Sequence, residues 1–229
     1  MIDAVIFDCD GVLVDSEVLA IRGEREALGA LGLDYDPPTY VERFVGMHDR
    51  TFFAALRIDY RAVHGQDAPS DFEETVLAGR RKHKDGLEAV AGAHDALRAA
   101  RERIGAVAVA SSSRAEFLRS KLERTGLFEL VAPHVYSADL VANGKPAPDI
   151  FLYAAERLGV APARCVVLED SVNGVRAARA AGMRAWGFLG GGHIFQGHEE
   201  RLIAAGAEAT LRDFRAAGRA ISALEKSIR

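Results

Sequence analysis

Short apolar runs separated by longer amphipathic stretches dominate the pattern of hydrophobic and polar positions along the chain. Five such runs occupy residues 4–7, 106–110, the surroundings of Val135 and Tyr136, 165–168 and 184–188. Each run is too short for a buried helix and is typical of a strand that is covered on both faces. Helical spacing between the runs gives the strand–helix alternation of a parallel sheet, so the pattern predicts an α/β fold.

Several of the predicted helices begin at a side chain that can accept a hydrogen bond from the helix N-terminus. Two of these positions form capping boxes, with an acid three residues after a serine. The predicted capping residues are Ser70 with Glu73, Ser113 with Glu116, Asp149, and Ser171.

The first two apolar runs are separated by roughly 100 residues, whereas a strand–helix–strand unit needs only about 30. Residues 17–86 contain no convincing strand, and their spacing predicts helices over 17–31, 39–45, 49–64 and 70–84. We therefore expect an α/β core formed by residues 1–16 and 87–229, with an all-helical insert over residues 17–86.

Composition excludes several classes of function. The 33 acidic and 29 basic residues give a net charge of −4, which opposes a nucleic-acid partner, because binding of backbone phosphates requires a basic surface. Charged residues interrupt every apolar run, so no membrane span or signal peptide is expected, and the default location is cytoplasmic. Cys9 and Cys165 are predicted to be free, buried thiols. Monomer and homodimer both remain open.

Polar side chains follow the predicted strands, and the carboxyl ends of parallel strands open onto one rim of a sheet. These residues are Asp8 and Asp10 after the first run, Ser111, Ser112 and Ser113 after the second, Lys145 near the third, and Glu169 and Asp170 after the fourth. Carboxylates suit a hard divalent cation such as Mg²⁺, and a lysine with hydroxyl groups suits phosphate oxygens. In isolation, Asp8 and Asp10 could be turn acids, Lys145 a surface lysine and Ser113 a helix cap. For Ser113 we expect the cap.

Four ordered motifs carry a resemblance to a known family. They are Asp8-Cys9-Asp10-Gly11-Val12, a serine at the end of the second strand, Gly144-Lys145-Pro146-Ala147-Pro148-Asp149, and Val167-Leu168-Glu169-Asp170-Ser171. In this order, with a cap-sized gap after the first, they resemble the haloacid dehalogenase-like superfamily. The chain is most similar to its helical-cap branch, which contains β-phosphoglucomutase, phosphoglycolate phosphatase and sugar-phosphate phosphatases.

The resemblance implies a Rossmann-like core, a helical cap and a role for each motif residue. Asp8 is then the nucleophile that forms an aspartyl phosphate, and Asp10 is the general acid and base. Phosphate binding falls to Ser111, Ser112 and Lys145. The implied Mg²⁺ ligands are Asp8, the main-chain carbonyl of Asp10, and Asp170, with Glu169 as a ligand or a neighbour of one.

The cap is expected to select the substrate. Within the cap, the segment 44–50 is expected to contact the substrate and set specificity through Gly46, His48 and Arg50. Mutases of this branch carry a histidine where this chain has Ala20, which favours a Mg²⁺-dependent phosphatase of a small phosphorylated metabolite, a sugar or sugar-acid phosphate. A phosphomutase is the alternative, and a catalytically silent binding protein is a third hypothesis. No histidine is assigned to a metal, and Gly190-Gly191-Gly192-His193 is expected to form a turn beside the site.

Overall fold

The computed structural model describes residues 2–45, 47 and 49–225 and divides the chain into two compact units. One unit comprises Met1–Asp15 and Glu88–Arg229, and the other comprises Ser16–Leu87. The first is built around a sheet and is called the sheet unit below. The second contains helices and no strand among its described residues, and is called the helical unit.

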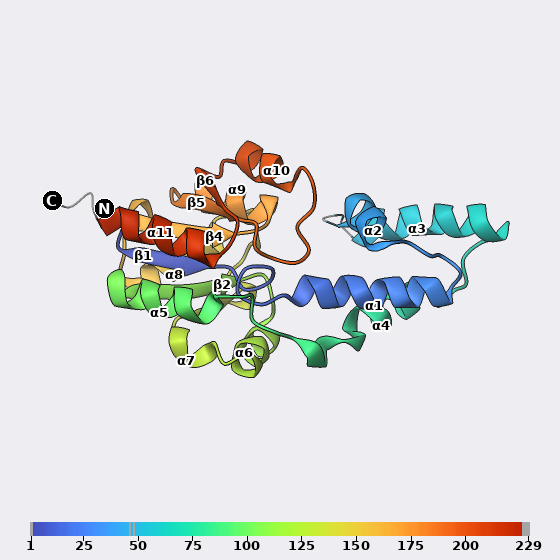
Figure 1. Cartoon of the computed structure of the whole chain (residues 1–229), viewed down its shortest axis with the longest axis horizontal. Coiled ribbons are helices and arrows are strands. Elements are labelled where there is room, and N and C mark those ends of the chain that lie inside the picture. Colours follow the sequence, from blue (N-terminus) through green and yellow to red (C-terminus); the bar gives the residue numbers. More distant parts are fainter. Residues whose placement is uncertain (1, 46, 48, 226–229) are drawn as a thin grey trace. The chain divides into compact units, whose positions relative to one another are not determined.

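The sheet unit contains six parallel strands in the order β3-β2-β1-β4-β5-β6 (Figure 1). Their bounds are β1 (Ala4–Phe7), β2 (Ala106–Ser111), β3 (Val135–Ser137), β4 (Cys165–Glu169), β5 (Arg184–Phe188) and β6 (Ala209–Leu211). The order reverses at β1, which pairs with β2 on one side and β4 on the other. Such a switch point is where ligands bind in open α/β sheets.

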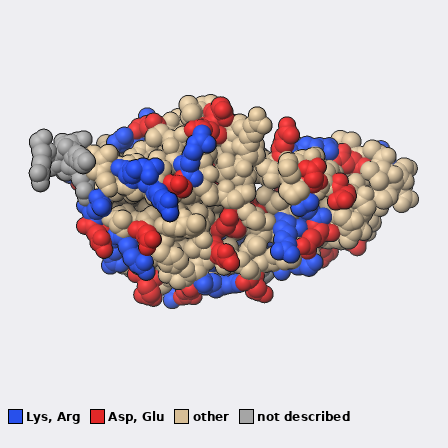
Figure 2. Space-filling model, in the orientation of Figure 1, with Lys and Arg blue, Asp and Glu red and all other residues tan. Residues whose placement is uncertain are grey.

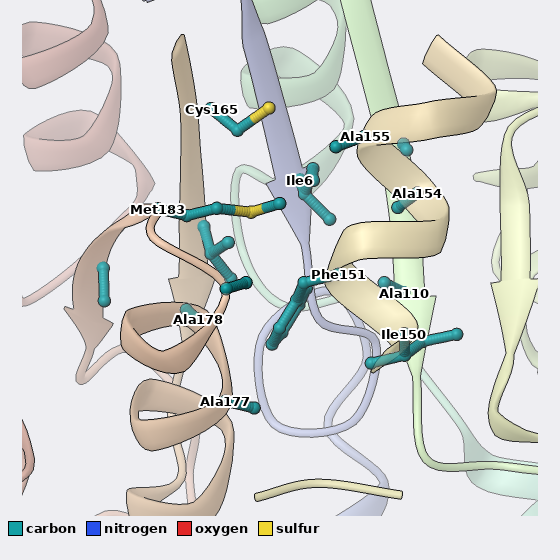
Figure 3. Close-up of a cluster of buried hydrophobic side chains, with 14 of the residues drawn as sticks. Ile6, Ala110, Ile150, Phe151, Ala154, Ala155, Cys165, Ala177, Ala178 and Met183 are labelled. Carbon is teal, nitrogen blue, oxygen red and sulfur yellow. The ribbon is translucent and has the colours of Figure 1, made fainter. Parts of the chain in front are cut away.

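Helices cover both faces of this sheet. They are α5 (Ala93–Arg103), α6 (Ala115–Arg124), α7 (Phe128–Val131), α8 (Asp149–Leu158), α9 (Val172–Ala180), α10 (His198–Ala205) and α11 (Phe214–Glu225). Figure 3 shows one apolar layer, in which Ile6 of β1 and Ala110 of β2 face Phe151 of α8. On the opposite face, Phe7 and Phe188 pack against Phe214 of α11, with ring centroids 6.5 and 4.6 Å apart. Alternate residues of β1 thus pack against the helices on opposite faces of the sheet, so every residue of the strand is buried.

The predicted α/β fold is confirmed, and the five predicted strands are present. The sixth strand, β6, was not predicted. It has only three residues, of which Ala209 is exposed and Leu211 is buried, so it lacks the continuous apolar run that revealed the other strands.

One of the predicted caps is confirmed. The Ser171 hydroxyl accepts a hydrogen bond from Gly174 N at 3.0 Å at the start of α9. The prediction for Asp149 was wrong by one position, because Asp149 is the first residue of α8 and its carboxylate accepts from Asn143 instead.

Both predicted capping boxes were wrong. Helix α6 begins after Arg114, and the Ser113 hydroxyl donates to Asp10 at 2.7 Å, so the attraction of a charged acceptor replaces the cap. Helix α4 begins at Phe72, one residue later than Ser70 could cap, and the preceding Asp71 makes no side-chain cap hydrogen bond.

The helical unit contains α1 (Ser16–Ala30), α2 (Pro37–Phe44), α3 (Asp49–His64) and α4 (Phe72–Lys82), followed by a 3₁₀ turn at Lys84–Gly86. Its core is rich in aromatic side chains, which meet mainly edge to face. Helices α1 and α4 approach closely at Gly23 and Gly79, where a Cβ on Gly23 would lie 1.9 Å from the Gly79 carbonyl oxygen. Glycine at this crossing is therefore a packing requirement.

Surface and thiol properties agree with the composition. Acidic and basic side chains are interspersed over the face drawn in Figure 2. In the described part of the chain, no helix combines the length and the apolar character that a membrane span needs. Cys9 and Cys165 are buried and free, as predicted.

Candidate active site

Asp8 follows β1 directly, at the switch point of the sheet. Its amide donates to the Leu168 carbonyl at 2.9 Å, which continues the pairing with β4, and its Oδ1 accepts from Lys145 Nζ at 2.5 Å. Burial raises the pKa of this carboxyl group, Lys145 opposes that effect, and nearby Glu169 and Asp170 raise it further, so that the pKa lies well above its usual range. The ionised form of Asp8 therefore depends on nearby positive charge.

Lys145 supplies such a charge. Its ammonium group donates to Asp8 Oδ1, to Glu169 Oε1 at 2.8 Å and to the Ala110 carbonyl at 3.1 Å, which uses all three of its protons. Burial alone would lower the pKa of Lys145, but the two carboxylates hold it above the usual value. The side chain is only 5% exposed, so this cation is fixed at the end of β1.

Glu169 ends β4 and is almost completely buried. Oε1 accepts from Lys145, and Oε2 accepts from the Ser171 amide at 2.8 Å and from its hydroxyl at 2.9 Å. Both oxygens are therefore bonded within the protein, and Glu169 orients Lys145 and the start of α9.

Asp170 lies between the loop after β1 and the segment after β5. Its Oδ2 is 3.0 Å from His193 Nε2, and its carbonyl accepts from His198 Nε2 at 2.6 Å. Gly11 has a φ of +75°, and a Cβ at this position would lie 1.9 Å from Asp170 Oδ2. Only glycine lets the loop approach the carboxylate so closely.

The serine run after β2 divides into three environments. Ser111 is buried at the strand end, and its hydroxyl accepts from the Ser113 amide at 3.0 Å. Ser112 is exposed. Ser113 donates to Asp10 Oδ2, while Lys121 donates to Asp10 Oδ1 and, at 3.1 Å, to the Ser113 hydroxyl.

The structure thus brings Asp8, Lys145 and Glu169 into one ion cluster, with Asp170 near Asp8. Asp10 forms a second cluster with Ser113 and Lys121. Of the residues predicted to contact the substrate, Arg50 is an exposed residue of α3 in the helical unit, and Gly46 and His48 lie outside the described residues.

Two contributors to these clusters, Lys121 and His193, are not marked by the four ordered sequence motifs. Lys121 belongs to a helical pattern, and nothing in its spacing relates it to Asp10, more than 100 positions away. His193 stands in the Gly190–His193 motif that was expected to be a turn beside the site. That turn does lie beside Asp170, but its histidine is buried against the carboxylate.

The family model described as "Hydrolase: haloacid dehalogenase-like hydrolase" matches residues 2–182. The chain belongs to this family. The predicted family is confirmed, and the chain is a hydrolase with phosphatases among its relatives.

Three relatives illustrate the range of this haloacid dehalogenase-like family. The Thermotoga maritima phosphorylated carbohydrates phosphatase is 33% identical over 79% of this chain and 82% of its own length. The Escherichia coli fructose-1-phosphate phosphatase YqaB is 34% identical over 79% of this chain and 93% of its own. The chloroplastic SUPPRESSOR OF QUENCHING 1 of Arabidopsis thaliana is 36% identical over 80% of this chain, which spans only 17% of that longer protein.

A solved structure agrees with the fold of this haloacid dehalogenase-like hydrolase. The family hydrolase of Deinococcus radiodurans, solved with bound phosphate and sodium, superposes with a TM-score of 0.83 at 34% identity and covers 99% of this chain and 96% of that one.

The donor set fits the cation that the haloacid dehalogenase-like family implies. No group of three or more His, Cys, Asp or Glu side chains converges as a metal site within the described residues. Mg²⁺ does not need one, because it binds through one or two carboxylates and completes its octahedron with water and substrate oxygens. Asp8 and Asp170 provide two carboxylates, and the close approach of Gly11 to Asp170 brings the main chain beside them.

Proposed function

We propose that the protein is a Mg²⁺-dependent phosphatase of a small phosphorylated carbohydrate, acting through an aspartyl phosphate on Asp8. The main support for the proposal is the buried contact between Asp8 and Lys145 at the switch point of the sheet. Lys145 also binds Glu169. Two of the relatives above are phosphatases named for a carbohydrate phosphate, which supports the same class of substrate.

In the first step, an Asp8 carboxylate oxygen attacks phosphorus, and the bond from phosphorus to the ester oxygen of the substrate breaks. The Lys145 ammonium offsets the repulsion between the carboxylate and the phosphoryl group and stabilises charge that develops in the transition state. The buried Ser111 hydroxyl and the neighbouring Ser112 would bind phosphoryl oxygens. Asp10 gives a proton to the departing oxygen.

In the second step, water attacks phosphorus, its proton passes to Asp10, and the bond from phosphorus to Asp8 breaks. Asp8 returns as a carboxylate and inorganic phosphate leaves. Covalent catalysis replaces one difficult displacement with two easier ones.

Asp8, Asp170 and the main-chain carbonyl of Asp10 would hold Mg²⁺. When bound, this ion supplies Lewis-acid stabilisation of the phosphoryl oxygens. Glu169 would support the site through Lys145 and Ser171, to which its two oxygens are bonded. His193 orients Asp170.

We assign the cap role to the helical insert of residues 17–86, and the reading of substrate to Gly46, His48 and Arg50. A cap excludes bulk water and brings specificity to a core that recognises only the phosphoryl group. Alanine variants of the three positions should change KM among sugar phosphates while kcat/KM for p-nitrophenyl phosphate stays the same.

The proposed function is tested by phosphate release from p-nitrophenyl phosphate and from a panel of sugar and sugar-acid phosphates with Mg²⁺. We expect turnover that Asp8→Asn abolishes, and that EDTA abolishes until Mg²⁺ is restored. Equal activity in the wild type and Asp8→Asn, or full activity in EDTA, would refute it. Isomerisation of a sugar phosphate supported by a bisphosphorylated sugar, without net phosphate release, would identify a mutase instead.

A further inference from the structure

Lys121 lies on α6, outside the four family motifs, and its side chain ends at Asp10. The ammonium group donates to Asp10 Oδ1 and, at 3.1 Å, to the Ser113 hydroxyl, which itself donates to Asp10 Oδ2 at 2.7 Å. Each carboxylate oxygen of Asp10 therefore accepts a hydrogen bond from a defined donor.

The scaffold around Lys121 is well fixed. Leu118 and Leu122 on the same helix are completely buried, and the Lys121 carbonyl accepts from the amide of Thr125 at 3.1 Å and from its hydroxyl at 2.8 Å. Helical side chains point back toward the N-terminus, which directs Lys121 toward the end of β2 and the loop that holds Ser113. The contact with Asp10 thus depends on helix packing.

This arrangement suits one half of the proposed reaction better than the other. A carboxylate that accepts two hydrogen bonds, one of them from a cation, is held in one orientation. In the attack of water on the aspartyl phosphate, the group that receives the proton must point at the water. A general base contributes only when its geometry is correct.

We infer that Lys121 is a positioning residue that, with Ser113, orients Asp10 as the base for hydrolysis of the aspartyl phosphate. The inference rests on the proposed function. In the assisted step, the water oxygen bonds to phosphorus, the water proton passes to an Asp10 oxygen, and the bond from phosphorus to Asp8 breaks with its electron pair remaining on Asp8. Lys121 touches none of the reacting atoms and acts through Asp10.

p-Nitrophenyl phosphate separates the two steps, because p-nitrophenolate is stable enough to leave without a proton. The first step then needs no acid, and kcat/KM reports that step alone. For Lys121→Met, we expect kcat to fall by about 10- to 100-fold, a part of the 10²- to 10⁴-fold that general acid–base catalysis provides. KM should fall in parallel, so that kcat/KM changes by less than about 3-fold.

Rapid mixing gives a second readout. When hydrolysis of the intermediate becomes limiting, Lys121→Met should release a burst of nitrophenolate that approaches one equivalent per active site before the slow steady state. Ser113→Ala should show a smaller change in the same direction, and Lys121→Arg should restore much of kcat.

Arg119→Met is the matched control, because Arg119 lies on the same helix and pairs at 2.7 Å with Glu123 in solvent. It should leave kcat and the burst unchanged. Circular dichroism establishes whether each variant is folded. If Lys121→Met does not fold, kcat and the burst of Ser113→Ala provide the test.

An unchanged kcat in Lys121→Met would overturn the inference. So would an equal loss in kcat and kcat/KM for p-nitrophenyl phosphate, which would identify Lys121 as a substrate-binding group. A wild-type enzyme that releases no nitrophenolate, or an Asp8→Asn variant that retains turnover, would instead overturn the proposed function.

Discussion

Replacing Gly174 with alanine would place a methyl group in the space that the Glu169 carboxylate occupies. Gly174 lies in the first turn of α9, and a Cβ built there would be 1.7 Å from Oε1 and 1.8 Å from Cδ of Glu169. Carbon atoms that are not bonded normally remain about 3.5 Å apart. The carboxylate would therefore have to move by about 2 Å to restore that separation.

The loss of stability follows from the hydrogen bonds that this displacement breaks. Glu169 accepts three hydrogen bonds, one from Lys145 and two from Ser171, at 2.8 to 2.9 Å. Each hydrogen bond to a charged group contributes about 1.5–3 kcal/mol, so losing two costs about 3–6 kcal/mol. Alanine favours a helix over glycine by up to about 1 kcal/mol, so we expect the free energy of unfolding to fall by about 2–5 kcal/mol.

Urea denaturation followed by far-ultraviolet circular dichroism measures this change. Gly218→Ala is the control, because Gly218 also lies in a helix of the sheet unit and a Cβ added there would meet no atom within 4 Å. There the helix propensity acts alone, and stability should rise by up to about 1 kcal/mol. A Gly174→Ala variant that is as stable as the wild type would refute the steric reasoning.

Two further predictions concern the helical unit. Burial, followed by the charge and hydrogen bond of Glu24, raises the pKa of Tyr40 above its usual value. The protonated phenol therefore contributes fully to stability below the unfolded pKa of about 10, and this contribution is lost as the pH rises above that value. Thermal melting between neutral and alkaline pH should show a steeper loss of stability in the wild type than in Tyr40→Phe, and parallel losses would contradict this. Leu56 is completely buried in α3, and Leu56→Ala should lower the free energy of unfolding measured by urea denaturation by about 2–5 kcal/mol. Ile58 of the same helix is 70% exposed, and Ile58→Ala should change that free energy by less than about 0.5 kcal/mol. Similar losses in both variants would refute the assignment of the core.

Much of the local structure could be predicted from the sequence, because it depends on interactions between near neighbours. The run at 4–7 is apolar at every position, and the pattern alone therefore identified a strand buried on both faces. The prediction over 49–64 matches α3 at both ends. Ser171 could be assigned as a cap because its acceptor and the Gly174 amide are three residues apart.

Errors arose where a distant partner competed with a local one. Ser113 has the spacing of a capping residue, but the charged Asp10 carboxylate accepts its proton instead. Strand β6 is specified by pairing with β5 and by the burial of Leu211, and neither is visible in three residues of mixed polarity.

The sequence by itself determined the motif residues of the candidate site, because motifs at strand ends record which chemical groups reach one rim of a parallel sheet, but it did not reveal Lys121 or His193. Only the tertiary structure decided how these groups pair. It joined Lys145 to both Asp8 and Glu169, Lys121 to Asp10, and His193 to Asp170. Burial strengthens each of these pairings, and burial depends on the packing of segments that are far apart in the chain.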